Sequence, residues 1–367
     1  MFTLSLWDFN GQMSMATQSA VSTLSDPGLL RSQGLIGGKW VQAYDGKTIQ
    51  VNNPATGEVI TNVPCMGRKE TTDAISSASE AFKTWSKLTA NERSKCLRKW
   101  YDLLIAHKEV LGKLITLEQG KPLKEAIGEV TYGANFIDFY AEEAKRIYGD
   151  IIPATLTDRR LFVIKQPVGV VGAITPWNFL LAMITRKVGP ALACGCTVVI
   201  KPSELTPLTA LAAVELSIQA GIPPGAVNVV MGNASEIGDT LLESSQVRKI
   251  TFTGSMAVGK KLMAGAAQTV KKVHNGCRIP RMESGADMFR GQDCYAYNHN
   301  LSVPPPATEM AHATTVAASM LLSGSTMSNN REPALSANSL FFSSSATSLF
   351  LSVSAPSNCT PVGLLKL

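Results

Sequence analysis

Apolar residues recur every three or four positions in three stretches of the first half of the chain, which predicts three long helices. The expected helices cover residues 74–85, 97–115 and 126–148, the first of them behind the candidate caps Thr71 and Thr72. Ahead of them, residues 36–41 and 48–52 are typical of short strands around an Asp45-Gly46 turn. We expect these helices to pack against a sheet or against one another.

From Gly169 the pattern changes to short apolar runs that alternate with helical stretches. The expected strands are 170–175, 197–201, 227–230 and 249–252, and the expected helices are 181–192, 208–220, 235–243 and 258–267. This alternation predicts right-handed βαβ crossovers and hence an α/β fold with a doubly wound parallel sheet. Ligands of such sheets bind at the carboxyl ends of the strands, so the informative loops are 175–180, 201–207, 231–234 and 253–257.

The composition changes after Val273. Residues 1–273 carry 29 Lys and Arg against 23 Asp and Glu, whereas residues 274–367 carry five of each. Residues 301–367 also contain 14 serines and a Pro304-Pro305-Pro306 run without a sustained period. We therefore expect a flexible segment over 1–34, a folded domain over 35–273 and an irregular, mostly disordered tail over 274–367.

Charge and cysteine content narrow the possible partners. The net charge of +6 is spread out, without a block of like charges or a basic stripe with aromatic residues, so nucleic acid is not an expected partner. Seven cysteines without paired spacing favour a reducing compartment over a disulfide framework and predict no metal site. With no run of 18 apolar residues, a membrane-spanning helix is not expected either.

Three of the loops carry candidate chemistry. In Thr175-Pro176-Trp177-Asn178-Phe179, the Asn178 amide could stabilise an oxyanion or simply cap the next helix. In Lys201-Pro202-Ser203-Glu204, the ammonium and the carboxylate suit the two hydroxyls of a ribose, although a plain surface ion pair is the alternative. A carboxylate there also repels a 2′-phosphate, which favours NAD over NADP.

The third loop runs from Gly254 and Ser255 to Gly259, between a strand and a helix. Backbone N–H groups at such a helix start attract phosphate, although a tight turn would explain the glycines as well. The loop imitates a nucleoside triphosphate-binding loop but has Lys261 where Ser or Thr must bind magnesium. A nucleoside triphosphatase is therefore disfavoured.

Together, Thr175–Phe179, Gly195–Glu204 and Phe252–Ser255 resemble the aldehyde dehydrogenase superfamily. The runs Glu118–Leu123, Tyr140–Ala144 and Ala182–Gly189 are most similar to its plant-type succinate-semialdehyde group, and the similarity extends from about residue 34 to 273. The resemblance implies a Rossmann-like cofactor domain, an oligomerisation arm near 148–168, NAD as cofactor and oxidation of a small aldehyde to its acid.

The resemblance also assigns roles to residues. Asn178 would be the oxyanion donor, Trp177 would line the cofactor cleft, and Arg186 would bind the carboxylate of the semialdehyde. The loop of Lys201, Pro202, Ser203 and Glu204 would hold the adenosine ribose, and Ser255 with the Gly254 turn and Gly259 would hold the pyrophosphate. Leu180 departs from the proline that the family has there.

A larger departure follows Val273. The family continues with a Leu-Glu-Leu-Gly-Gly strand that bears the general base, whereas this chain has His274-Asn275-Gly276-Cys277. The nucleophile turn is also not found at its usual distance, and Cys294, in Gly291-Gln292-Asp293-Cys294, is the only look-alike. A nucleophilic thiol needs a lowered pKa and a positioned base. The break is typical of an alternative splice form or a misassembled gene model.

From this departure we expect the catalytic domain to be missing and the truncated chain to be inactive. The alternative function is a non-catalytic fragment that binds dinucleotide or forms hetero-oligomers with full-length subunits through the arm. By resemblance we expect the mitochondrial matrix, with the cytoplasm as the alternative because residues 1–33 contain Asp8, Asp26 and only one basic residue, Arg31.

Overall fold

The structure is a computed structural model that describes residues 27–277 and 351–354. A mixed seven-stranded sheet lies at its centre, with strand order β11-β10-β7-β8-β9-β1-β2. The strands of the main body and of the arm that leaves it are β1 (Gly34–Ile36), β2 (Lys39–Val41), β3 (Thr48–Asn52), β4 (Val59–Pro64), β5 (Asp150–Ile152), β6 (Arg159–Val163), β7 (Val170–Ile174), β8 (Thr197–Lys201), β9 (Val227–Val229), β10 (Val247–Gly254), β11 (Lys272–Cys277) and β12 (Leu351–Ser354).

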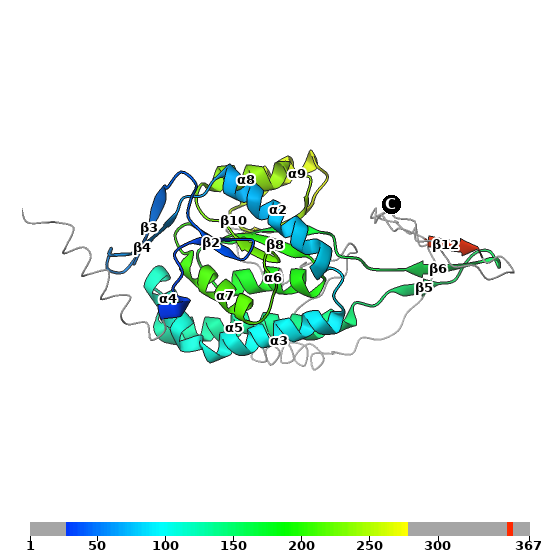
Figure 1. Cartoon of the computed structure of the whole chain (residues 1–367), viewed down its shortest axis with the longest axis horizontal. Helices are drawn as coiled ribbons and strands as arrows, with labels where there is room; N and C mark the ends of the chain where they lie inside the picture. The colour runs from blue at the N-terminus through cyan, green and yellow to red at the C-terminus, as the bar shows by residue number, and fades with distance from the viewer. Residues whose placement is uncertain (1–26, 278–350, 355–367) are drawn as a thin grey trace, which may run out of the picture.

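Helices cover both faces of this sheet (Figure 1). One face carries α2 (Arg68–Trp85), α8 (Ala234–Glu243) and α9 (Met256–Ala267), and the other carries α6 (Ala182–Ala193) and α7 (Leu208–Gln219). Outside α6 and α7 lies a further layer made of α3 (Ala90–Ala106), α4 (Lys108–Gln119) and α5 (Leu123–Glu143). The short 3-10 turns are η1 (Pro27–Leu29) and η2 (Ala144–Arg146).

The five strands β11, β10, β7, β8 and β9 run parallel. Four of them, β7 to β10, correspond to the strands that the alternating pattern predicts, whereas β11 was not predicted. From β7 the chain proceeds outward to β8 and β9, and then returns to place β10 on the other side of β7. This reversal makes the sheet doubly wound and places its switch point between β7 and β10. All five residues of β8 are buried, which suits a central parallel strand covered on both faces.

The N-terminal hairpin differs from the prediction. Its turn is Gly37-Gly38, whose φ angles of +61° and +79° suit glycine, and it joins β1 antiparallel to β2. The predicted turn at Asp45-Gly46 is present between β2 and β3, where the Gly46 N–H donates to the Ala43 carbonyl at 3.0 Å. The two strands do not pair across it, because β3 pairs instead with β4, a strand that the sequence analysis did not recognise. The pair of β1 and β2 extends the parallel sheet with an antiparallel edge through β9.

Two helix boundaries also differ. The candidate caps Thr71 and Thr72 lie inside α2, where their hydroxyls donate to the Gly67 and Arg68 carbonyls, because Gly67 is the cap and Glu70 accepts from its N–H. The stripe expected to form one helix over 97–115 is divided into α3 and α4 at His107. Both halves still pack on α5, which explains why the apolar period continues across the break.

Two buried clusters hold the layers together. The larger one, between the sheet and α3 to α7, contains Trp85 and Trp100, whose indole N–H groups donate to the carbonyls of Leu192 (3.2 Å) and Ala213 (2.9 Å). The smaller one, beneath α8 and α9, contains Phe252. A buried indole that keeps a hydrogen-bond partner contributes apolar area without an unsatisfied donor. Within the described residues, no helix has the length and apolar character needed to cross a bilayer.

The hairpin of β5 and β6 leaves the main body as a long arm (Figure 1). It falls within the stretch 148–168 to which the resemblance assigns an oligomerisation arm. The strand β12 pairs antiparallel with β6, Leu351 opposite Phe162. Of the tail expected over 274–367, the structure thus describes the end of β11 and this strand, and the rest lies outside the described residues.

Candidate functional site: a cavity at the switch point of the sheet

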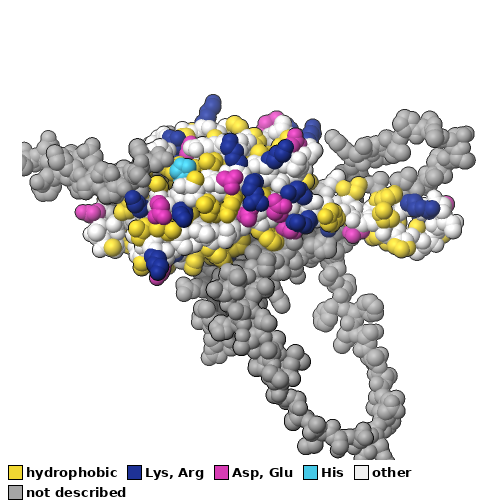
Figure 2. Space-filling model, turned by 90° about the horizontal axis from the view of Figure 1, so that it is seen from below, with side chains coloured by type: hydrophobic (Ala, Val, Ile, Leu, Met, Phe, Trp, Pro, Cys, Tyr) yellow, Lys and Arg dark blue, Asp and Glu magenta, His cyan; other side chains and the backbone are white. Residues whose placement is uncertain are grey.

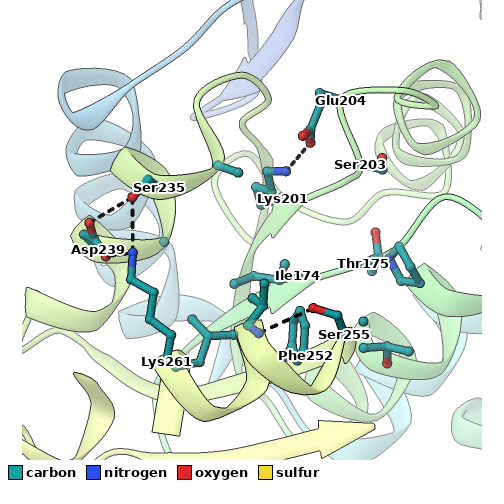
Figure 3. Close-up of a pocket in the computed structure, with 17 residues that line it drawn as sticks. Ile174, Thr175, Lys201, Ser203, Glu204, Ser235, Asp239, Phe252, Ser255 and Lys261 are labelled. Atoms are coloured by element: carbon teal, nitrogen blue, oxygen red, sulfur yellow. Dashed lines mark hydrogen bonds and ion pairs between the residues drawn. The ribbon is translucent and has the colours of Figure 1, made fainter. Parts of the chain in front are cut away.

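A cavity of about 350 Å³ lies at the carboxyl ends of β7 and β10, at the switch point. Such a position and such a volume are typical of nucleotide and cofactor sites in doubly wound sheets. Its walls come from the ends of β7, β8 and β10 and from α8 and α9 (Figure 3), and they include Thr175, Pro176, Lys201, Ser203, Glu204, Ser235, Asp239, Phe252, Gly254, Ser255, Val258 and Lys261.

The Lys201 and Glu204 side chains meet on one wall of this cavity (Figure 3). Lys201 ends the buried strand β8, and its Nζ lies 2.6 Å from Oε2 of Glu204. Burial acts to raise the pKa of Glu204, but the hydrogen bond and the charge of Lys201 outweigh it and lower that pKa overall. The carboxylate is therefore charged at neutral pH and 44% exposed, so it can accept hydrogen bonds from a bound polyol.

The opposite wall is the start of α9. Ser255 caps this helix, with its Oγ accepting from the Val258 N–H at 3.4 Å (Figure 3). The first turn carries no acidic side chain, so the partial positive charge of the helix start faces the cavity without compensation from such a side chain. A phosphate group is the ligand that such an environment prefers.

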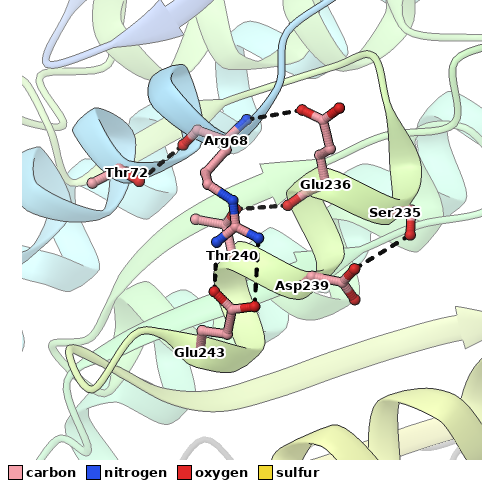
Figure 4. A network of polar contacts seen from close by, with 7 residues as sticks. All are labelled: Arg68, Thr72, Ser235, Glu236, Asp239, Thr240 and Glu243. Atoms are coloured by element: carbon pink, nitrogen blue, oxygen red, sulfur yellow. Dashed lines mark hydrogen bonds and ion pairs between the residues drawn. The ribbon is translucent and has the colours of Figure 1, made fainter.

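The back of the cavity is a polar cluster between α8 and α9. The Lys261 ammonium lies 3.2 Å from Oγ of Ser235 and 3.5 Å from Oδ1 of Asp239. Figure 4 shows how α8 is joined to α2 by Arg68, which forms an ion pair with both carboxylate oxygens of Glu243 at 2.5 and 3.4 Å. On the face of the molecule seen in Figure 2, basic and acidic side chains are interspersed. The sequence analysis assigned no site role to Ser235 or Asp239.

The loop between β7 and α6 places Asn178 and Trp177. Asn178 does not cap α6, because the capping residue of that helix is Leu181 and it receives no side-chain cap. The Oδ1 atom of Asn178 is buried and accepts no hydrogen bond within the described residues. Trp177 is half exposed, whereas Pro202 and Gly259 are buried. None of these three residues is among those that line the cavity.

Arg186 is buried on α6 with neutral partners. Its guanidinium donates to the Ala182 carbonyl (3.2 Å) and the Tyr132 hydroxyl (3.2 Å), and lies 4.8 Å from the centre of the Phe136 ring. Burial lowers the pKa of Arg186. Its guanidinium is nevertheless the most strongly basic side-chain group and carries its positive charge. A buried cation whose hydrogen-bond partners are all neutral is suited to an anionic ligand.

The next residue of α6, Lys187, donates to Oγ1 of Thr253 at 2.6 Å and joins this helix to the end of β10. His274 lies on the neighbouring strand, and its burial, helped by the charges of Lys249 and Lys187, lowers its pKa to about 4. The imidazole is thus neutral at physiological pH. The look-alike nucleophile Cys294 lies outside the described residues.

The structure therefore brings together Lys201, Ser203, Glu204, Gly254 and Ser255 around one cavity, as the loop analysis predicts. An open α/β sheet with a cavity at its switch point is the arrangement in which doubly wound proteins bind nucleotide cofactors and other small ligands.

Comparison with known proteins narrows this class to a family. The aldehyde dehydrogenase family model matches residues 40–277, and the chain belongs to that family. A mitochondrial succinate-semialdehyde dehydrogenase of Arabidopsis thaliana is 78% identical over 262 residues, which cover 71% of this chain and 50% of that protein. The chain thus spans about half the length of the curated relatives it matches.

Solved structures agree with this assignment. An NADP-dependent enzyme of E. coli is similar with a TM-score of 0.68 and 53% identity, over 69% of this chain and 52% of that one. Betaine aldehyde dehydrogenase of Staphylococcus aureus in complex with NAD+ is similar with a TM-score of 0.67 and 35% identity, over 71% and 51% of the two chains. Similar folds therefore serve both nicotinamide cofactors.

Proposed function

We propose that this chain binds NAD in the cavity between β7 and β10, and that its family-level reaction is the oxidation of succinate semialdehyde to succinate. The observation that carries the proposal is the pairing of Lys201 with Glu204 opposite the start of α9, which together suit a ribose and a pyrophosphate. NAD supplies a hydride acceptor when it is bound. The charge of Glu204 favours it over NADP, whose 2′-phosphate would lie near a carboxylate.

The substrate side of the proposal uses Asn178 and Arg186. The Asn178 amide can donate to the aldehyde oxygen as negative charge develops there, and preorganised donors of this kind stabilise a transition state by several kcal/mol. The buried guanidinium of Arg186 suits the carboxylate at the other end of a semialdehyde. The identity of 78% with a succinate-semialdehyde dehydrogenase supports this substrate.

We also propose that the catalytic half of the family fold is missing and that the chain is inactive on its own. None of the cysteines at 65, 96, 194 and 196 lines the cavity, and β11 carries His274-Asn275-Gly276-Cys277 where we expect the strand of the general base. Purified chain should bind NAD yet form no NADH from succinate semialdehyde. Steady NADH formation that Cys294→Ala abolishes would contradict this.

A second candidate function is a dinucleotide-binding fragment that pairs with full-length subunits. This candidate is favoured by apolar side chains on the arm that are exposed to solvent, among them Ile151 (75% exposed) and Ile164 (65% exposed). Co-purification with a tagged full-length enzyme, lost on Ile151→Lys, is the expected result. Failure of the wild-type chain to co-purify with the full-length enzyme would reject pairing.

For the location we propose the mitochondrial matrix, as in the mitochondrial relatives, with the cytoplasm as the alternative. A fusion of residues 1–40 to a fluorescent reporter should accumulate in mitochondria. A diffuse cytosolic signal would overturn the proposal.

A further inference from the structure

The loop that carries Asn178 is held by a different part of the chain. Two backbone groups of the loop bond to side chains of the segment that precedes and forms α5. The Asn178 carbonyl accepts from Nζ of Lys121 at 3.3 Å, and the Leu181 N–H donates to Oε1 of Glu129 at 3.0 Å. Because α6 has no side-chain cap of its own, the Glu129 carboxylate takes the place of that cap.

These two side chains also bind each other. Lys121 and Glu129 form a short ion pair, and the two side chains are only 11% and 1% exposed. The Lys121 ammonium lies 4.4 Å from the centre of the Phe179 ring as well, so it contacts the loop a second time. A buried pair of this kind holds its geometry firmly, since separating the charges would leave either one buried without compensation.

The ion pair contacts the loop at Asn178 and again shortly after it. Lys121 fixes the backbone at residue 178 itself, and Glu129 fixes it three residues later. The Asn178 Oδ1 accepts no hydrogen bond within the described residues, so these backbone anchors control where the amide points. The Glu129 charge also acts on Arg186, because it favours the protonated guanidinium.

We propose that Lys121 and Glu129 are positioning residues that hold the loop 176–181 in the conformation that presents the Asn178 amide to the substrate. This inference rests on the proposed function of Asn178. It assigns a functional role to a pair on α4–α5 that lines no part of the cofactor cavity. The pair acts through the loop backbone and does not itself contact the substrate.

Amide hydrogen exchange tests the positioning without any need for turnover. Lys121→Met and Glu129→Gln should each speed exchange of the amides in 178–182 by about tenfold or more, while exchange in α7 is unchanged. Lys121→Arg should restore slow exchange. The matched control is Lys145→Met, which removes an exposed ion pair with Glu142 near the other end of α5. Unchanged exchange in 178–182, or equally faster exchange in α7, would overturn the proposal.

A variant with one buried charge left unpaired can fail to fold. The double variant Lys121→Met/Glu129→Gln removes both charges, and the same faster exchange confined to 178–182 is expected from it. Slow exchange in a folded double variant would overturn the proposal.

Kinetics provide a second readout in preparations that turn over succinate semialdehyde, such as an assembly with full-length subunits that carry the same variants. Lys121→Met should lower kcat as Asn178→Ala does, with KM for NAD unchanged, and adding it to Asn178→Ala should cause no further loss. Additive losses would overturn the positioning role. If Asn178→Ala itself leaves kcat unchanged, the proposed function fails, and hydrogen exchange alone decides whether the pair holds the loop.

Discussion

Glu118 is a buried carboxylate whose ionisation should make the stability of this protein depend on pH. It lies 2% exposed near the end of α4 and accepts hydrogen bonds from the N–H groups of Leu208 (2.8 Å) and Thr209 (2.7 Å) at the start of α7, and from the Thr209 hydroxyl. Burial raises its pKa from 4.5 to about 7, although these hydrogen bonds favour the charged form.

The sign of the effect follows from the two pKa values. Because the pKa of Glu118 is higher in the folded chain, the folded state binds more protons between pH 4.5 and about 7. The free energy of unfolding therefore falls as the pH rises through this window. The shift from 4.5 to about 7 corresponds to ~3 kcal/mol, since a tenfold change in an acid constant is worth ~1.4 kcal/mol.

Glu118→Gln removes this titration and keeps the size of the side chain. Urea unfolding of both proteins from about pH 5 to about pH 8 should show the variant gaining ~2.5 kcal/mol relative to the wild type, because the rest of the effect lies below pH 5. Glu125→Gln, an exposed carboxylate in the first turn of α5, controls for the loss of one negative charge. A constant difference between wild type and Glu118→Gln at every pH would refute the reasoning.

Three further predictions concern the cofactor and the core. Glu204→Gln should narrow the preference for NAD over NADP by about fivefold in calorimetric titrations, because like charges a few ångströms apart repel by ~1 kcal/mol even in water; equal affinities of the wild type for both cofactors would reject the ribose assignment. Trp100→Phe should lower the free energy of unfolding by ~2 kcal/mol, since it leaves the buried Ala213 carbonyl without its donor, and a value near zero would show that the site relaxes. Gly232→Ala should cost ~2–4 kcal/mol, because φ is +137° and the new Cβ would lie 2.4 Å from the Met66 nitrogen; unchanged thermal unfolding would contradict it.

Local periodicity was sufficient to predict the parallel strands β7 to β10, although not β11. The run 197–201 is β8 residue for residue, and the four helices expected after Gly169 are present as α6 to α9. Each of these elements buries the apolar residues of its own local pattern. The pattern ends at the loops that carry Lys201 and Ser255. The cavity could therefore be placed between the correct loops before its geometry was known.

The pattern was not sufficient to predict which strands pair or where one helix ends and the next begins. The alternation in 36–41 and 48–52 does not reveal that β3 pairs with β4, because strand pairing depends on neighbours that are distant in the sequence. The apolar stripe of 97–115 likewise hides the break at His107, since both helices face the same surface of α5. The periodic signal records the face that is buried, and does not record the path of the backbone.

The amino-acid sequence by itself determined the βαβ order, the loops of the cofactor cavity and the residue types available there. Only the tertiary structure decided that Lys121 and Glu129 bind the loop of Asn178, and that Glu118 caps α7 from α4. These contacts join residues separated by 52 to 91 positions. These contacts are strong because they form in the interior, away from water, and that interior exists only after the layers have packed.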